Sequence, residues 1–278
     1  MKKSKIFFCF IPLIIFILSC GKSSEELARE QKKFEQLISQ GDKFFNKSEY
    51  LKALNFYLKA EKIDSKDGLL LYKLGFCYYD KAKKKLFEAK RYYYEDNEEK
   101  SKQCVKDSLK YFNKAKKYYL KALKFLDTNK NIHYVAATYF NLGVIYLNLG
   151  SITKKQKYFE KKYDYFISAY SLLTKIEEMG KANGLDLFRL AYYYMDNKED
   201  EMAIEYYKKA IEKLKIENPY HFYYSGAYFN IGLIYWNKNE IDKTLYYWKK
   251  ALEIDPHNSL YNEFYTKALE KKEELENL

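Results

Sequence analysis

Three histidines are the side chains best suited to acid–base or metal chemistry, and their positions favour neither. His133, His221 and His257 are expected in turns between helices, and none has another His or a Cys at metal-ligand spacing. The sequence has no Gly-rich phosphate loop and no HExxH motif, and its acidic residues are scattered through Lys-rich segments. Because no nucleophile, base and oxyanion donor come together, we expect no catalytic residue, metal site, cofactor or small-molecule substrate.

One cysteine does stand in a context that suggests chemistry. Three lysines within the first five residues precede an apolar run, Ile6 to Leu18, that is too short to span a bilayer comfortably. The run ends in Ile17-Leu18-Ser19-Cys20-Gly21, which resembles a bacterial lipobox, although isoleucine replaces the usual leucine at position 17. The resemblance implies that residues 1–19 are a lipoprotein signal peptide and that Cys20 is acylated, for example with palmitate.

Several acyl chains on Cys20 would hold the protein on a membrane, because each buried methylene contributes about 0.8 kcal/mol. The resemblance places the protein in the bacterial cell envelope, at a periplasmic or outer-membrane face. An ordinary signal peptide or an uncleaved anchor is the alternative. Residues 20–33 form a short tether and a helix start, because Ser23-Ser24-Glu25-Glu26 can cap a helix.

Two apolar stripes between Ser225 and Asn258 predict a pair of helices. The stripes recur at i, i+3, i+4, i+7 and at i, i+4, i+7, and consist of Tyr228, Ile231, Gly232 and Tyr235, then Thr244, Trp248 and Ala251. Pro256 ends the second helix, because proline disfavours helical geometry in the residue before it. This spacing resembles the tetratricopeptide repeat (TPR), a helix–turn–helix unit that stacks into a solenoid. Gly232 and Ala251 are expected at the closest approach of the two helices, with aromatic side chains alongside.

Four earlier segments repeat the pattern, so the resemblance covers residues 34–258 and implies an all-α solenoid of about five repeats. The matching residues are Gly41, Phe44, Ala53, Tyr57 and Ala60; Leu71, Leu74, Gly75, Tyr78, Ala115, Tyr119 and Ala122; Tyr139, Leu142, Gly143, Tyr146, Lys162, Phe166 and Ala169; and Leu187, Leu190, Ala191, Tyr194, Ala203, Tyr207 and Ala210. Lys162 replaces a small residue and is expected to weaken its helix.

Two insertions interrupt the repeats, near residues 82–110 and 150–161. The first remains helix-compatible and has a polar turn at 95–98, so it predicts a helical hairpin that overruns the solenoid and turns near Asn97. Residues 259–278 predict a capping helix that starts at Ser259 and ends at about Glu276, with a charged outer face. No segment is rich in Pro or Gly/Ser, so one domain without a flexible linker is expected.

Cysteine spacing in the mature chain argues against a disulfide. Cys9 lies in the signal segment and Cys20 is expected to be acylated, which leaves Cys77 and Cys104. If the hairpin turns near Asn97, the two lie about 20 Å apart along it, whereas a disulfide requires Cα atoms within about 7 Å. Cys77 is therefore expected to be a small core residue.

The chain is basic, with a formal net charge of +12, or +9 (12 − 3) without the three signal lysines. Lysines cluster at 81–85, 114–124 and 154–162, and the basic patch singled out is Lys83, Lys84 and Lys85. Basic runs with tyrosines can bind nucleic acid, but an exported lipoprotein rarely meets it, so no nucleic-acid partner is expected. Anionic lipid is the more accessible partner, and solvated helix faces are the simpler interpretation.

TPR domains bind ligands on a concave surface lined by three residues of each first helix. The corresponding residues here form what we call the concave stripe: Tyr72, Phe76, Tyr79; Phe140, Val144, Leu147; Phe188, Tyr192, Met195; and Phe229, Leu233, Trp236. All twelve are apolar or aromatic, and a helix apolar on two stripes is normally buried on both. The stripe is either a partner-binding groove or is covered by adjacent helices and the terminal helix. The carboxylate-clamping groove of chaperone-binding TPR domains is not reproduced, since Lys73 and Arg189 stand isolated.

These observations predict a non-catalytic, membrane-anchored scaffold that binds a segment of a partner protein in the concave stripe. The competing class is a structural envelope lipoprotein that contacts anionic lipid or polymer through its basic helices. An enzyme is the least expected of the three classes. The repeat positions pack helices together and do not identify the partner.

Overall fold

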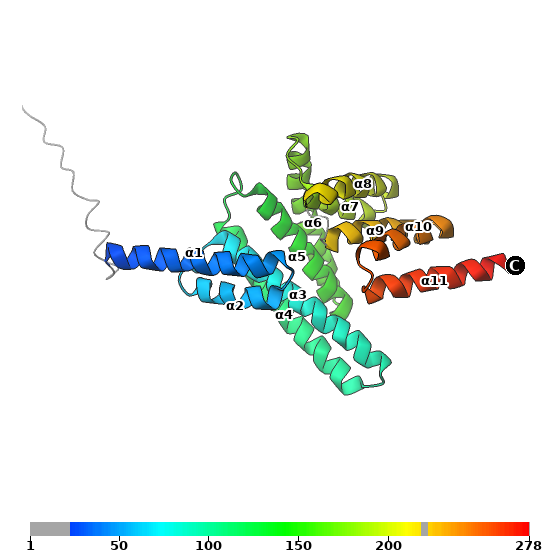
Figure 1. Cartoon of the computed structure of the whole chain (residues 1–278), viewed down its shortest axis with the longest axis horizontal. Coiled ribbons are helices and arrows are strands. Elements are labelled where there is room, and N and C mark those ends of the chain that lie inside the picture. The colour runs from blue at the N-terminus through cyan, green and yellow to red at the C-terminus, as the bar shows by residue number, and fades with distance from the viewer. Residues whose placement is uncertain (1–22, 218–221, 278) are drawn as a thin grey trace, which may run out of the picture. The chain divides into compact units, whose positions relative to one another are not determined.

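The computed structural model describes residues 23–217 and 222–277, and all regular secondary structure in these ranges is α-helical. Consecutive helices form hairpins, and a last helix follows them (Figure 1). The helices are α1 (Ser24–Asn46), α2 (Tyr50–Glu61), α3 (Gly68–Tyr94), α4 (Glu98–Phe125), α5 (Ile132–Thr153), α6 (Gln156–Glu178), α7 (Gly184–Asp196), α8 (Asp200–Glu217), α9 (Phe222–Asn237), α10 (Ile241–Ile254) and α11 (Ser259–Glu276). The predicted all-α solenoid with a long hairpin and a terminal helix is confirmed.

The chain divides into two compact units between Lys66 and Asp67. Helices α1 and α2 belong to the first, and α3 to α11 belong to the second. This differs from the single domain expected from composition. The first helix pair has a core of its own, in which Gly41 lies against Tyr57 and the Tyr57 hydroxyl donates to Asp42 at 2.6 Å.

In four of the five helix pairs of the described residues, an aromatic ring of the second helix lies directly on a glycine of the first. A Cβ on Gly232 would come within 2.3 Å of the Trp248 ring, and one on Gly143 within 2.4 Å of Phe166. Gly75 and Tyr119 form the equivalent contact in the α3–α4 pair, where the separation would be 2.8 Å. Glycine is thus required because the ring occupies the space of its side chain, whereas the sequence had suggested aromatics beside the contact.

Two asparagines join successive helix pairs of the second unit. Asn141 on α5 donates to the Tyr119 hydroxyl on α4 at 3.0 Å, and Asn230 on α9 donates to the Tyr207 hydroxyl on α8 at 2.9 Å. Burial raises the pKa of both tyrosines well above the usual value. Their hydroxyls therefore stay protonated and serve as fixed hydrogen-bonding groups inside the core.

The first insertion extends α3 and α4 to 27 and 28 residues, and the chain turns between Glu95 and Asn97 as predicted. This hairpin projects in Figure 1 beyond the helices beside it. The Asn97 side chain accepts from the Lys100 backbone N–H and caps α4. The second insertion likewise lengthens α5 and α6, which meet at Lys154 and Lys155.

Every turn within a pair contains one non-glycine residue in the left-handed region. These residues are Ser48, Asp96, Lys154, Lys198 and Asn239, with φ between 52° and 63°. Such a conformation disfavours most side chains. Four of these turns share a three-residue geometry with the left-handed residue in the middle, whereas the α5–α6 turn has two residues and begins with the left-handed Lys154.

The helix ends agree with the sequence at most positions. Ser23 and Glu26 form the predicted capping box of α1. Helix α11 ends at Glu276 as expected, but its N-cap is Asn258, whose side chain accepts from the Tyr261 backbone N–H, and Ser259 is the first helical residue. The proposed Ser259 cap was therefore one residue too late. The lipobox-like segment with Cys20, and also His221, lie outside the described residues.

Both cysteines of the second unit are free and buried. Cys77 is fully enclosed, and burial raises the pKa of its thiol. Cys104 lies farther along the hairpin, with Sγ 3.9 Å from Glu88 on α3. A buried, protonated Cys77 packs as a small apolar residue.

Helix α5 is long and apolar enough to cross a membrane by length and composition. However, 67% of its most apolar window is buried within the protein. Its apolar residues pack against neighbouring helices, as Ala136 and Phe140 do against the α6–α8 core. It is therefore a core helix.

Lys162 is buried and has an acidic partner. Its ammonium group lies 2.8 Å from Asp196 at the end of α7 and 4.1 Å from the Tyr163 ring centroid. The side chain is 6% exposed. Rather than only weakening α6, this lysine connects α6 to the following helix pair.

Candidate partner-binding surface

The first residue of each triplet in the concave stripe is packed between repeats. Phe140 lies between Phe166 of its own pair and Tyr192 of the next, with ring centroids 5.5 and 5.4 Å away. Phe229 lies in the same way between Trp248 and Tyr261.

Tyr72 and Phe188 repeat this arrangement. Tyr134 of α5 covers Tyr72 at 5.2 Å, and Tyr223 of α9 covers Phe188 at 5.0 Å. All four first residues are therefore buried, each with a ring from the first helix of the next pair, or from α11, against it. For these four residues the structure agrees with the alternative in which adjacent helices cover the stripe. They stabilise the stacking of repeats and are not accessible to a partner.

The second and third residues of the triplets are more open. Phe76 is buried, whereas the other seven are half-buried: Tyr79, Val144, Leu147, Tyr192, Met195, Leu233 and Trp236. Tyr192 packs edge-on against Phe140 and Phe166, and Trp236 lies 5.7 Å from Trp248. These residues form a partly exposed apolar strip whose inner edge packs against buried side chains of the repeats.

Helix α11 takes the place of a next first helix at the end of the solenoid. Its Tyr261 and Phe264 pack on Phe229, in a cluster that includes Leu233 and Trp236. The terminal helix thus covers Phe229, the first stripe residue of the last repeat, while Leu233 and Trp236 remain partly exposed.

The sequence model of the tetratricopeptide repeat matches residues 136–161, 187–212 and 225–258. Of the glycine–aromatic contacts described above, the one between Gly232 and Trp248 lies entirely within the last match. The chain is a tetratricopeptide repeat protein.

Solved TPR structures share this fold at low identity. A thermophilic TPR protein of Thermus thermophilus superimposes with a TM-score of 0.54 and 18% identity over 85% of this chain and 98% of that one. A chain of the APC/C hetero-tetramer Cut9–Hcn1 gives 0.56 and 14% over 94% of this chain and 40% of its own. No match to a curated protein was found. TPR proteins are protein–protein interaction scaffolds, typically without catalytic activity.

The stripe on α3 of this TPR protein continues along the insertion. From Tyr79 the same helix face carries Lys83, Phe87, Lys90 and Tyr94, at i+4, i+8, i+11 and i+15. Phe87 and Tyr94 are 54% and 67% exposed. Lys90 lies 2.9 Å from Glu263 in the first turns of α11, so this extension reaches the terminal helix.

Two hollows follow this extension. One, of about 450 Å³, includes Lys83, Phe87 and Tyr94 with Asn148 of α5. The other, of about 260 Å³, lies between α3 and α11 and includes Phe87, Arg91 and Leu260. The first volume lies within the range of about 300–1,000 Å³ that small-ligand sites usually occupy, and the second lies below it.

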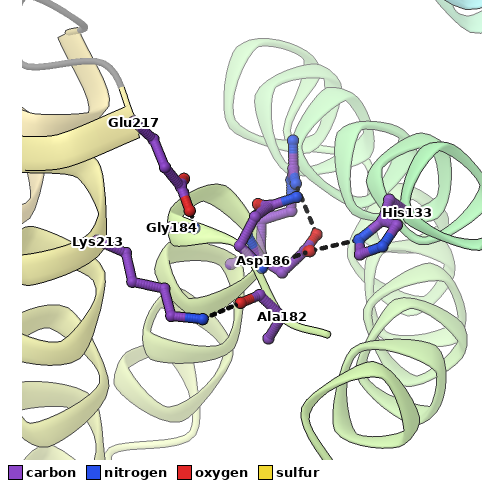
Figure 2. A network of polar contacts seen from close by, with 8 residues as sticks. His133, Ala182, Gly184, Asp186, Lys213 and Glu217 are labelled. Atoms are coloured by element: carbon purple, nitrogen blue, oxygen red, sulfur yellow. Dashed lines mark hydrogen bonds and ion pairs between the residues drawn. The ribbon is translucent and has the colours of Figure 1, made fainter. Parts of the chain in front are cut away.

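A buried polar network joins the third and fourth TPRs (Figure 2). The Asp186 carboxylate is fully enclosed; one oxygen lies 2.6 Å from His133 Nδ1 and the other accepts from Arg189 Nη1 at 3.3 Å. It also accepts from the Asn183 backbone N–H at 3.2 Å.

Two expectations from sequence were wrong here. His133 lies in the first turn of α5 and has an acidic partner, and Arg189 is paired and 5% exposed. His133 and Asp186 are 53 residues apart in the chain, so local spacing could not connect them.

The turn before α7 is held by α8. Lys213 donates to the Ala182 carbonyl, and the Glu217 carboxylate accepts from the Gly184 backbone N–H at 2.9 Å (Figure 2). With Asp186 engaged by three donors, the whole cluster serves to position α7. Among the described residues, no group of three or more His, Cys, Asp or Glu could hold a metal ion.

The predicted basic patch is largely neutralised within α3. Lys84 pairs with Asp80 at 2.8 Å and Lys85 with Glu88 at 2.5 Å. The Lys83 ammonium lies 5.8 Å from the Tyr79 ring centroid. Two of the three charges therefore have acidic partners on the same helix.

Proposed function

We propose that this chain is a non-catalytic, lipid-anchored TPR scaffold that binds an apolar segment of a partner protein on the half-buried part of the concave stripe. The observation that supports this most is the strip formed by Tyr79, Tyr192, Met195 and Trp236, which remains partly open on a tightly packed frame. Such side chains gain further burial only when something covers them. The segment would enter as a helix or an extended strand.

Replacing Trp236 by alanine should weaken partner capture by about 2 kcal/mol or more, since large aromatic anchors usually provide most of the binding energy. Capture of envelope proteins by the purified full chain, after crosslinking, measures the effect. Helical content and melting midpoint must be checked, because Trp236 also contacts Trp248. Tyr246→Ala, at a residue 58% exposed on α10, is the matched control. Equal capture by Trp236→Ala and wild type would contradict the proposal.

The anchor part of the proposal rests on the sequence around Cys20. Cys20→Ala should leave the precursor unprocessed or release the protein from membranes, because no thiol remains at the cleavage site to carry acyl chains. Metabolic labelling with palmitate and membrane fractionation measure this. Labelling that persists in the variant would show that another residue carries the lipid.

A structural envelope lipoprotein that contacts anionic lipid or polymer through lysines remains the alternative. The pairing of Lys84 and Lys85 with carboxylates of α3 speaks against it, because paired lysines have less charge to offer a polyanion. That alternative expects lysine substitutions to reduce envelope binding, and stripe substitutions only to reduce stability.

A further inference from the structure

The excess positive charge of the chain is concentrated in two short segments. Residues 106–124 of α4 carry seven lysines and one aspartate, and residues 154–161 at the start of α6 carry four lysines and one glutamate. Together they contribute +9 (11 − 2), which equals the net charge of the whole chain without its three signal lysines. The other residues are therefore balanced, and attraction of this protein to a polyanion should act mainly through these two segments.

The lysines of α4 lie on the side of the helix that faces away from the core. Phe112 and Tyr119 belong to its buried face. Lys106, Lys110 and Lys117 recur at i, i+4 and i+11 on the opposite face, and all three are exposed. With Lys124 at i+18, which is also exposed, the row is about 27 Å long at about 1.5 Å per residue.

Tyr146 of α5 joins this row to the lysines of α6. The Lys116 ammonium of α4 lies 5.6 Å from the Tyr146 ring centroid, and the Lys161 ammonium of α6 lies 5.9 Å from the same centroid. The two segments are therefore parts of one surface. We call the lysines of residues 106–124 and 154–161 the lysine face.

The lysine face lacks the acidic partners that lysines elsewhere in the second unit have. Lys84 and Lys267 each pair with a carboxylate of the same helix, at 2.8 and 2.9 Å. In the part of the chain that the structure describes, no carboxylate pairs with Lys110, Lys117 or Lys157. The charge of these three lysines is therefore available to an external anion.

Two features favour an anionic bilayer over a nucleic acid as the partner. The face contains no arginine, so it offers separate point charges and not the planar forks that bind phosphates and base edges in pairs. The aromatic side chains of the two segments are all buried or half-buried, which leaves no exposed ring on which a base could stack. Many separated lysines attract anionic headgroups without needing a fixed geometry.

The acidic turn of the α3–α4 hairpin lies too far away to cancel this attraction. From Glu99 to Lys110 the helix rises about 16 Å, and exposed charges are largely screened beyond about 10 Å at about 0.1 M salt. Glu98 is also paired with Lys102, at 2.7 Å. A bilayer against Lys110, Lys117 and the start of α6 can therefore leave the turn in solvent.

We propose that the lysine face lies against the headgroups of a bilayer that contains anionic lipid. This contact adds to the scaffold proposed above, and rests on that proposal only in that the chain must reach a bilayer. The face belongs to α4 and α6, the second helices of their pairs, whereas the concave stripe belongs to α3, α5, α7 and α9. The protein can therefore hold a membrane and a partner protein on different helices.

Cosedimentation with vesicles tests the proposal on the full chain with Cys20→Ala, in which no acyl chain at residue 20 holds the protein on a vesicle. Partition onto phosphatidylcholine vesicles that contain phosphatidylglycerol should exceed partition onto phosphatidylcholine alone at least tenfold, and high salt should abolish the difference. Binding by the apolar residues 6–18 is common to both vesicles, so the ratio reports charge. Lys110→Glu/Lys117→Glu/Lys157→Glu should lower the ratio at least fivefold, and the matching glutamine variant should lower it less.

Lys208→Glu/Lys215→Glu/Lys249→Glu is the matched control, because it changes the net charge equally at exposed lysines of α8 and α10. It should change the ratio less than twofold, and circular dichroism checks that every variant is folded. Equal partition onto both vesicles, or equal losses in the two glutamate variants, would overturn the proposal. Tighter binding of single-stranded DNA or polyglutamate than of the phosphatidylglycerol vesicles, at equal charge concentration, would do the same. Trp236→Ala should leave the ratio unchanged, so this contact and the stripe can fail separately.

Discussion

Asp186→Ala is expected to destabilise the second unit by about 3–5 kcal/mol, the usual cost of removing one partner from a buried ion pair. The change leaves the Arg189 guanidinium buried without its carboxylate and leaves His133 and the Asn183 N–H without their acceptor. Thermal and urea denaturation measure the loss, which corresponds to roughly 2–4 °C per kcal/mol for a domain of this size.

Two further variants test whether the loss of stability is specific to the buried Asp186 or would follow the removal of any carboxylate. Asp242→Ala removes an 84% exposed carboxylate that pairs with Lys272, and should cost about 1 kcal/mol or less. The double variant Asp186→Leu/Arg189→Met removes both buried charges and should recover part of the loss. If Asp186→Ala and Asp242→Ala were equally stable, the network would not hold α7 in place.

Gly232→Leu should cost about 3 kcal/mol, at the upper end of the range for overpacking. Even a Cβ at this position would lie 2.3 Å from the Trp248 ring, and that ring is fully buried with its Nε1 bonded to the Phe229 carbonyl at 3.0 Å. Neither helix nor ring can shift without breaking this contact. The melting midpoint and the tryptophan emission of the full chain measure the change.

Gly226 provides a control on the same helix. A Cβ there would meet nothing closer than 3.7 Å, so Gly226→Ala should be neutral or stabilising by up to about 1 kcal/mol, given the higher helix propensity of alanine. An unchanged midpoint for Gly232→Leu would mean that the helices do not approach each other at this residue.

Much of the fold follows from residue spacing. The helices and the hairpin turn at residues 95–97 follow from local periodicity and turn residues, and the glycine contacts follow from the spacing of the repeat that the two helices form. The last helix was predictable to within one residue at its start, because Asn258 and Ser259 can both serve as a cap.

The contacts between repeats were less predictable. Residue types alone could not show that Tyr134, Tyr192, Tyr223 and Tyr261 each cover the first stripe residue of the preceding repeat. A half-buried binding residue and a fully packed one have the same apolar character and the same helical spacing. The Lys162–Asp196 and His133–Asp186 pairs were missed for a related reason, since each joins distant segments.

The contact between Lys90 and Glu263 spans 173 residues of sequence. A repeat protein ordinarily behaves as a row of nearest neighbours, so that its last helix can fray while distant repeats remain folded. Here the terminal helix also contacts the hairpin of the second repeat, and opening at either place removes a contact from the other. Fraying of α11 and opening of the hairpin are therefore coupled by about 1 kcal/mol or less, the usual contribution of a partly exposed ion pair, which is a link between distant repeats that a linear solenoid lacks.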